Sequence, residues 1–319
     1  MNSDNNVFKN MFTNKIWVFL IATLCAVLWG SAFPVLKISY EELKIPADDF
    51  NSKLVLAGMR FFLAAVLLIA LVLFEKRSVK VGKKYVPELV ISGLLQITLQ
   101  YFFFYNGLGK TSGMKGAIIN SSSVFFVFIL AHLFYKDDKL TWKKVFGLTF
   151  GFAGIILVNY GKSFTPDFTL RGEGYLVLAA VFSAFGTIVS KRLSVHLDTK
   201  LMTAWQMLLG SLLLVLCGLP ALTNNTMNFT TKAWGLLIYS AFLSAAAFSL
   251  WYSLLRLNKA GEISVYMFIT PVSGAILSAL LVPGEHLSVL MLGSLFLVAV
   301  GIISVNSQSR RRRQATKME

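Results

Sequence analysis

Long apolar stretches, separated by short polar segments, occupy most of this chain of 319 residues. Ten of them have close to the twenty or so residues that an α-helix needs to cross about 30 Å of hydrocarbon. These stretches are residues 16–38, 54–74, 87–108, 113–135, 142–159, 172–190, 200–219, 233–254, 262–282 and 287–305. They lack the alternation of a membrane β-barrel, and helices are the other structure that satisfies its backbone within lipid. We therefore predict an all-α, polytopic membrane protein with ten transmembrane helices.

The two halves of the chain resemble each other. The stretch AVLWGSAFPVLKIS begins at Ala26, and AVFSAFGTIVSKRLS begins at Ala180. Each contains a lysine followed closely by serine, and these lysines, Lys37 and Lys191, are 154 residues apart. Because each lysine ends its helix, we expect both ammonium groups to reach water by snorkelling.

A second pair of stretches marks the ends of the two repeats. KLTWKKVFGLTFGFAGIILVN ends at Asn159 and HLSVLMLGSLFLVAVGIISVN ends at Asn306, and at this spacing Asp138 corresponds to Glu285. We predict an N-terminal tail over 1–15, a first five-helix repeat over 16–159, a second over 172–306 and a basic tail over 307–319. Because each repeat has an odd number of helices, the second is inverted relative to the first. Inverted repeats are typical of secondary transporters, whose substrate sites lie near the bilayer midplane.

The net charge of +15 indicates the orientation of the chain rather than a nucleic-acid partner. With the N-terminus inside, the cytoplasmic segments hold 21 Lys and Arg residues, and the outer loops hold seven. Such an excess in short cytoplasmic loops is the positive-inside rule. We therefore predict a multi-pass protein of the cell membrane with both termini in the cytoplasm. The arginines at 310–313 are interpreted as a membrane anchor.

The placement of reactive side chains argues against an enzyme. All fifteen Asp and Glu residues lie in loops, in tails or at span ends, whereas intramembrane enzymes place carboxylates deep in the bilayer. The three histidines show no metal-ligand spacing, and Cys25 and Cys217 lie inside spans, where packing is the simplest interpretation. GLGKTSG at 107–113 lacks the first glycine of a phosphate-binding loop, because Phe104 stands there. We predict no catalytic residue, no metal site and no cofactor.

Arg60 is the strongest single indication of a binding site. It lies six residues into the second span, where a buried arginine costs about 2.5–3.5 kcal/mol on insertion scales. One interpretation is structural: the side chain snorkels to the outer headgroups or bonds helix-end carbonyls. The other is functional: the guanidinium faces a central cavity and holds a carboxylate or phosphate by paired hydrogen bonds.

Polar and aromatic residues within the spans complete the candidate substrate site. Gln96 and Gln100, and nearly Tyr101, share a helical face that should point inward, because glutamine facing lipid is costly. They bind substrate or hydrogen-bond to other helices, and the sequence leaves both interpretations open. The set comprises Trp29, Gln96, Gln100, Tyr101, Asn120, Trp205, Gln206, Trp251, Tyr252, Tyr266 and Thr270. Gln206 has the same place in its span as Arg60, so we expect the two to line opposite ends of one pathway.

Several stretches resemble the EamA-type permeases of the drug/metabolite transporter superfamily. They are WGSAFPVLKI, RFFLAAVLL and ISVYMFITPVSGAILSALLVPGEHLS, with the acid–Leu–Thr/Ser patterns after spans four and nine. The resemblance covers about residues 16–306 and implies a ten-helix carrier of the plasma membrane that exports small metabolites, such as amino acids, or drugs.

Proline placement predicts a hinge. The family often has proline where this chain has Ser122, whereas Pro271 is kept in the ninth span, so a hinge is better supported in the second half. Pro271 has no amide hydrogen, so the carbonyl of Met267 loses its helical partner. We predict a bend or an unwound turn there, beside Thr270.

The resulting hypothesis is a secondary transporter that exports a small metabolite, either an amino acid or related compound or a drug, by alternating access. One alternative is a sugar-phosphate or nucleotide-sugar exchanger, which would need several cavity-facing cations where this chain offers Arg60 and Lys37. Another is a receptor or assembly factor that moves no solute. The glycines at 147, 151 and 154 allow close helix approach, either inside the monomer or in a homodimer.

Overall fold

The computed structural model describes residues 10–46, 48–108, 110, 113–160, 168–219, 227–283 and 286–315. Every regular element within these residues is helical. Glu285, the expected counterpart of Asp138, lies outside the described residues, as do residues 1–9 and 316–319 of the predicted tails.

The helices follow the ten predicted stretches. The first repeat contains α2 (Lys15–Glu42), α3 (Phe50–Phe74), the 3-10 turn η1 (Lys83–Tyr85), α4 (Val86–Gly93), η2 (Leu94–Leu99), α5 (Gln100–Leu108), α6 (Gly113–Ser121), α7 (Ser123–Phe134) and α8 (Trp142–Val158). The second contains η3 (Leu170–Gly174), α9 (Tyr175–Ser194), α10 (Thr199–Gly218), α11 (Thr231–Leu257), α12 (Ala260–Ser264), η5 (Val265–Phe268), α13 (Ile269–Leu281) and α14 (Val289–Ala315).

These elements form ten spans, five in each half. Elements α4, η2 and α5 make the third span, α6 and α7 the fourth, and α12, η5 and α13 the ninth. Within the described residues, nine helical runs have at least 18 residues and the apolar character of a membrane span. The fifth span, α8, has 17 residues and is about 26 Å long. The predicted all-α polytopic architecture is confirmed.

Polar residues explain where several spans begin. The side chains of Asn14, Asp49, Asp198 and Thr230 each accept a hydrogen bond from a backbone N–H in the first turn of α2, α3, α10 and α11. Such N-caps satisfy donors that have no partner within the helix. Each of these spans therefore begins one residue after a capping side chain.

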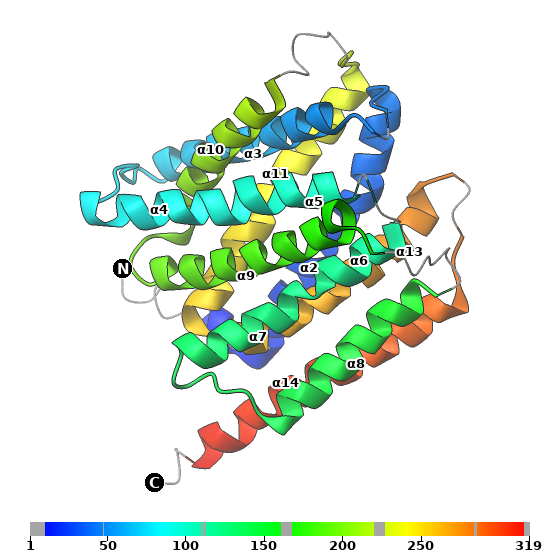
Figure 1. Ribbon diagram of the computed structural model, residues 1–319. Helices are drawn as coiled ribbons and strands as arrows, with labels where there is room; N and C mark the ends of the chain where they lie inside the picture. Colours follow the sequence, from blue (N-terminus) through cyan, green and yellow to red (C-terminus); the bar gives the residue numbers. More distant parts are fainter. Residues whose placement is uncertain are drawn as a thin grey trace.

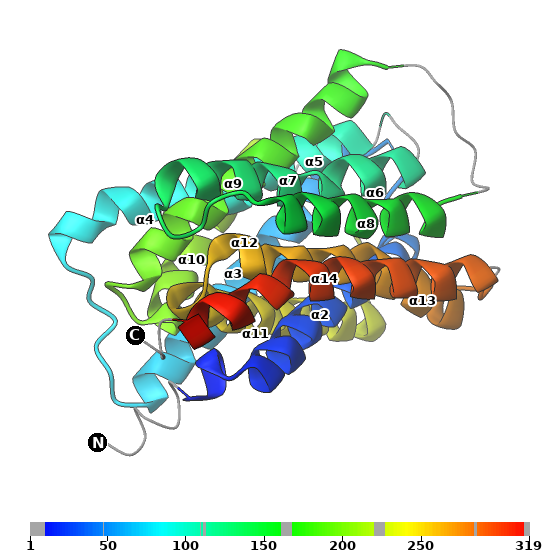
Figure 2. The ribbon, with the colours of Figure 1, turned by 90° about the horizontal axis from the view of Figure 1, so that it is seen from below.

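The two repeats interleave in the bundle (Figure 1). Equivalent spans pack on each other, with α3 along α10 and α8 along α14. The first span of each repeat packs on the other repeat: α2 lies on α11 and α13, and α9 lies on α5 and α7. Figure 2 shows the two layers that result, one with α4 to α7 and α9, the other with α2 and α11 to α13.

Glycine contacts show that equivalent spans run in opposite directions. A Cβ atom on Gly147 would lie 2.7 Å from the carbonyl oxygen of Gly301, and one on Gly301 would lie 2.7 Å from that of Gly147. Further along α8, a Cβ atom on Gly154 would lie 2.9 Å from the carbonyl oxygen of Ser294, which is earlier in α14. The two helices are therefore antiparallel, as inverted repeats require, and these glycines serve packing within the chain.

Polar contacts join the helix ends on one side of the bundle. Nη1 of Arg77, after α3, lies 3.1 Å from a carboxylate oxygen of Asp198, before α10. The side-chain amide of Asn258, after α11, donates to the carbonyl of Phe12, before α2, at 2.8 Å. This side, where α2 begins and α3, α7, α9 and α11 end, is termed the terminal face.

Lys191, half-buried at the terminal face, binds the end of a neighbouring helix. Its ammonium group donates to the carbonyl oxygens of Leu255, at 2.7 Å, and of Asn258. The last carbonyls of a helix have no donor within the helix, so this lysine caps the end of α11. The sequence did not predict this contact, because the acceptors belong to another helix.

Three spans are interrupted near the middle. The third contains the π-helical segment η2, which the sequence did not predict. The ninth contains the 3-10 segment η5, which ends three residues before Pro271, where an irregular turn was predicted. The fourth is broken at Ser122, between α6 and α7, and its hydroxyl donates to the carbonyl of Ile119 at 2.6 Å. The sequence favoured an interruption in the second half of the chain. The structure corrects this, because Ser122, which bonds its own backbone, interrupts a span of the first half too.

Candidate functional site

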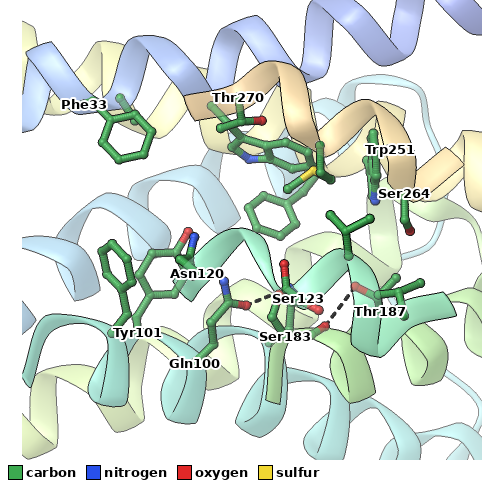
Figure 3. A pocket seen from close by; sticks show the side chains of 18 of the residues that line it. Phe33, Gln100, Tyr101, Asn120, Ser123, Ser183, Thr187, Trp251, Ser264 and Thr270 are labelled. Atoms are coloured by element: carbon green, nitrogen blue, oxygen red, sulfur yellow. Dashed lines mark hydrogen bonds between the residues drawn. The ribbon is translucent and has the colours of Figure 1, made fainter. Parts of the chain in front are cut away.

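A cavity of about 140 Å³ lies between the two layers of helices (Figure 3). Its lining comes from α2, α3, η2, α5, α6, α7, α9, α11, α12, η5 and α13, so both repeats contribute. A water needs about 10–15 Å³ of such space, so the cavity has room for roughly ten waters. A small metabolite with a similar number of non-hydrogen atoms would fit.

Most of the residues predicted for the substrate site meet at this cavity. Trp29, Arg60, Gln96, Gln100, Tyr101, Asn120, Trp251, Tyr252 and Thr270 all line it. They come from seven elements that belong to both repeats. The inward face predicted for Gln96 and Gln100 is confirmed.

Gln206, Tyr266 and Trp205 do not line the cavity. Tyr266 borders a smaller pocket at the terminal face, beside Asn258. The indole Nε1 of Trp205 donates to the carbonyl of Val79, in the linker after α3, at 3.0 Å. Both aromatic residues point away from the space between the layers, so their inclusion in the site is corrected.

Gln206 is instead a fully buried hydrogen-bonding residue between helices. Its Nε2 donates to the hydroxyl of Ser92 at 2.7 Å and to that of Ser190 at 3.0 Å. These serines belong to α4 and α9, and a Cβ atom on Gly93 would lie 2.9 Å from the carbonyl oxygen of Gln206. Because α4 and α10 approach this closely, the Gln206 side chain is enclosed at their contact. The expectation that it lines a pathway opposite Arg60 is therefore wrong.

Arg60 lies inside the bundle and not at the membrane surface. It is 3% exposed, and it stands about 15 Å along α3 from the start of that helix. Its Nε donates to the hydroxyl of Ser244 at 2.6 Å, and its guanidinium carbon lies 5.1 Å from the centre of the Phe61 ring. Snorkelling to outer headgroups and bonding to helix-end carbonyls are both excluded by this geometry. The cavity-facing interpretation agrees with it.

Two glutamines on the third span face the cavity together. Nε2 of Gln96 donates to Oε1 of Gln100 at 2.8 Å, one helical turn away. The span bends at this point through η2, and π-helical turns are frequent at functional sites. Gln96 packs directly against Gly186 of α9, where a Cβ atom would lie 3.0 Å from the Cβ of Gln96.

Aromatic rings cover one end of the cavity. The ring of Trp29 meets those of Phe248 and Trp251 edge to face, with both pairs of centroids 5.2 Å apart. Figure 3 places Trp251 and Ser264 at one end of the cavity and Phe33 and Tyr101 toward the other. The cavity thus has an end where Trp251 lies beside the hydroxyl of Ser264, and an end near Tyr101 that carries amides and the guanidinium.

Several buried polar atoms on the lining have no hydrogen-bond partner among the described residues. They are Nε1 of Trp29, Oε1 of Gln96 and Oγ1 of Thr270. Buried polar groups are nearly always paired, and each unpaired group needs an explanation. A bound polar molecule or water would supply these partners.

The sequence did not single out the hydroxyl residues of the lining. Ser123, Ser183, Thr187 and Ser264 all face the cavity. The hydroxyl of Thr187 donates to the carbonyl of Ser183 at 2.9 Å, as serine and threonine commonly do in helices. Because such residues satisfy themselves within one helix, nothing in the sequence distinguishes them from packing residues.

A second cavity of about 140 Å³ adjoins the first on the side away from the terminal face. It lies between α6 and α13, and shares Asn120 and Thr270 with the central cavity. Leu108, Gly116 and Pro271 complete its far side. The halves of spans four and nine nearer the terminal face, α7 and α12, pack together instead. The two spans therefore touch at one end and diverge at the other.

Both halves of the chain match one family model. The model of the EamA-like transporter family matches residues 15–160 and again residues 170–307. The chain belongs to the EamA-like transporter family. It is therefore a multi-pass membrane transporter with two EamA repeats, and not an enzyme.

Individual relatives agree with this assignment to the EamA-like family. YvbV of Bacillus subtilis (strain 168), an uncharacterized transporter, is 26% identical over 301 residues, which cover 93% of each chain. A WAT1-related chloroplast protein of Arabidopsis thaliana is 27% identical over 300 residues, which cover 91% of this chain and 69% of that protein. A solved crystal structure matches with a TM-score of 0.75 at 17% identity, over 92% of this chain and 98% of that one, which shows the fold alone.

Proposed function

We propose that this EamA-family transporter exports a small metabolite from the cytoplasm across the cell membrane by alternating access, with the substrate held in the central cavity. The observation that carries the proposal is that nine residues singled out in the sequence surround one cavity between the two repeats. Amino acids, related compounds and drugs, the solutes that the sequence suggests, are of a size that the cavity admits.

The packing of spans four and nine supports a gated pathway. Toward the terminal face, α7 and α12 close the bundle, and toward the opposite face the second cavity separates α6 from α13. The irregular segments at Ser122 and η5 divide both spans at this level, and Pro271 is proposed as part of the hinge. With the predicted orientation, the cavity would be closed toward the cytoplasm and would continue outward.

A sugar-phosphate or nucleotide-sugar exchanger is less well supported. A doubly charged phosphate group is usually held by several Lys or Arg side chains. Of the described residues that line the central cavity, Arg60 is the one that carries a charge. A substrate with a single anionic group suits this lining better.

A tolerance and accumulation assay tests the proposed export. Cells that lack this transporter would carry an empty plasmid, the wild-type gene or the Trp251→Leu variant, and would be exposed to amino acids, dipeptides, toxic analogues and organic acids. We expect the wild-type gene to raise tolerance and to lower the internal concentration for one chemical group, and Trp251→Leu to weaken this effect. Unchanged accumulation for every compound, with normal protein levels in the membrane, would refute export.

A further inference from the structure

Arg60 is a buried cation without a carboxylate partner on the described lining of the cavity. The side chain is 3% exposed, and no Asp or Glu is among the described residues that surround the cavity. A charge removed from water is costly unless an opposite charge and hydrogen bonds compensate for it. Because no carboxylate on the described lining offsets the charge of Arg60, we expect a ligand that carries a negative charge.

The hydrogen bonds of Arg60 leave the outer part of its guanidinium available. The group has five N–H donors, and Nε uses one of them to bind Ser244 at 2.6 Å. The hydroxyl of Ser244 in turn donates to the carbonyl of Ser240 at 2.6 Å, so its lone pair faces Nε. Within the described part of the chain neither terminal nitrogen has a hydrogen-bond partner, so both can form the paired bonds that a carboxylate accepts.

The opposite end of the cavity favours an aromatic body. Trp251 follows Ser244 by seven residues on α11, which places the aromatic end about 10 Å from the guanidinium end. Trp29, Phe248 and Trp251 form this end, with edge-to-face contacts at 5.2 Å. No described lining residue there carries a negative charge, so an ammonium group would be buried without a counter-ion.

We infer that the central cavity selects small organic monoanions: a carboxylate binds Arg60, and a planar aromatic body packs against Trp29 and Trp251. A zwitterion of the same shape is disfavoured because its cationic group finds no acidic partner. A neutral analogue is disfavoured because it leaves Arg60 without compensation. This inference rests on the proposed function, in that the cavity is taken as the substrate site, and it narrows the substrate to a net charge of about −1.

Three compounds that share one carbon skeleton test this selection by charge. Hydrocinnamate is a monoanion, phenylalanine is a zwitterion and hydrocinnamamide is neutral. Their affinities for the purified full-length protein would be measured by the ligand-dependent rise in its melting temperature. We expect hydrocinnamate to bind at least about tenfold more tightly than the other two. Equal binding of all three, or no binding of any, would overturn the inference.

Variants of Arg60 test whether its guanidinium causes the preference for hydrocinnamate. Arg60→Gln should abolish the preference for hydrocinnamate, and Arg60→Lys should retain part of it, because the charge remains while the planar fork is lost. Arg256→Gln removes the same charge from an exposed position on α11 and should leave the preference unchanged. If Arg60→Gln does not fold, Ser244→Ala, which removes only the partner of Nε, should still weaken hydrocinnamate binding several-fold. A preference that persists in folded Arg60→Gln, or in Ser244→Ala at full strength, would contradict the role of Arg60.

Transport in proteoliposomes distinguishes this inference from the proposed function. Flux of labelled hydrocinnamate that exceeds the flux of phenylalanine supports both. Binding of hydrocinnamate without flux of any probe would refute the transport role of the cavity and retain the anion site. Faster flux of phenylalanine or hydrocinnamamide than of hydrocinnamate would support transport and overturn the selection of monoanions.

Discussion

The carboxylate of Asp138, in the first repeat, accepts a hydrogen bond from the backbone N–H of Gly261, in the second repeat. One carboxylate oxygen accepts this hydrogen bond at 2.9 Å, and the other lies 2.5 Å from the ammonium of Lys144. Asp138 and Lys144 are 2% and 5% exposed, so the ion pair is shielded from solvent. Gly261 lies in the first turn of α12, so the bond ties the linker before α8 to the start of the ninth span.

We expect Asp138→Ala to lower the free energy of unfolding by about 3 kcal/mol, because Lys144 would remain buried without its counter-charge. Asp138→Ala/Lys144→Met should recover part of the loss, since it removes both charges. Thermal denaturation of the purified protein in detergent measures these changes. Glu88→Ala is the control, because Glu88 pairs with Arg192 at 3.4 Å with side chains that are 32% and 73% exposed. This exposed pair should contribute less than about 1 kcal/mol, and similar losses for both single variants would contradict the prediction.

Close contact between α8 and α14 makes Gly301 intolerant of a side chain. A Cβ atom there would lie 2.7 Å from the carbonyl oxygen of Gly147 and 2.9 Å from the amide nitrogen of Gly151, and backbone atoms cannot move aside individually. Gly301→Ala should therefore destabilise the protein by about 1–3 kcal/mol. Gly235→Ala is the matched control in α11, where no atom lies within 4 Å of the Cβ position. It should be neutral or should stabilise by up to about 1 kcal/mol, since alanine favours helix over glycine.

The position of Gln206 reverses the expectation drawn from the sequence. Because its amide bonds Ser92 and Ser190 away from the cavity, Gln206→Leu should reduce thermal stability by about 1 kcal/mol or more and leave substrate selectivity unchanged. Gln100→Leu, at the cavity, should change selectivity instead. Competition between unlabelled solutes for uptake into proteoliposomes measures selectivity. A changed selectivity profile in Gln206→Leu, with an unchanged melting temperature, would show that Gln206 reaches the pathway.

The irregular turn before Pro271 predicts a kinetic effect. Pro271→Ala restores an N–H that can bond the carbonyl of Met267, so the ninth span should become more regular and less able to bend. We expect a lower maximal transport rate and an unchanged substrate affinity. Pro46→Ala, in the linker before α3, is the control and should alter neither quantity. A normal maximal rate for Pro271→Ala would remove Pro271 from the proposed hinge.

Thiol labelling in intact cells tests the predicted orientation. In a Cys25→Ala/Cys217→Ala background, Asp48→Cys, between α2 and α3, should react with a membrane-impermeant maleimide. Lys80→Cys, in the linker after α3, should react only after the membrane is permeabilised. Both native residues are exposed, so access depends on the side of the membrane and not on burial. Reaction of Lys80→Cys in sealed cells would invert the topology.

The ten spans and the inverted repeats could be predicted because they depend on local properties of the chain. An apolar stretch of sufficient length must be helical in lipid, wherever its neighbours lie. The same reasoning located part of the site, because polar residues such as Arg60 and Gln96 are costly toward lipid and must therefore point inward.

Which inward-facing residue reaches the cavity was decided by the tertiary structure alone. Gln96 and Gln206 are equally polar and both lie inside their spans, yet Gln96 lines the cavity and Gln206 is not among its described lining residues. The difference lies in neighbouring helices: α4 and α10 meet closely at Gly93 and enclose Gln206, whereas Gln96, which packs against Gly186 of α9, also borders the open space between the layers. Helical periodicity determines the face on which a side chain lies, but the distance between two helices at that level depends on residues far away in the sequence. That distance determines whether an inward side chain meets another helix or an open space.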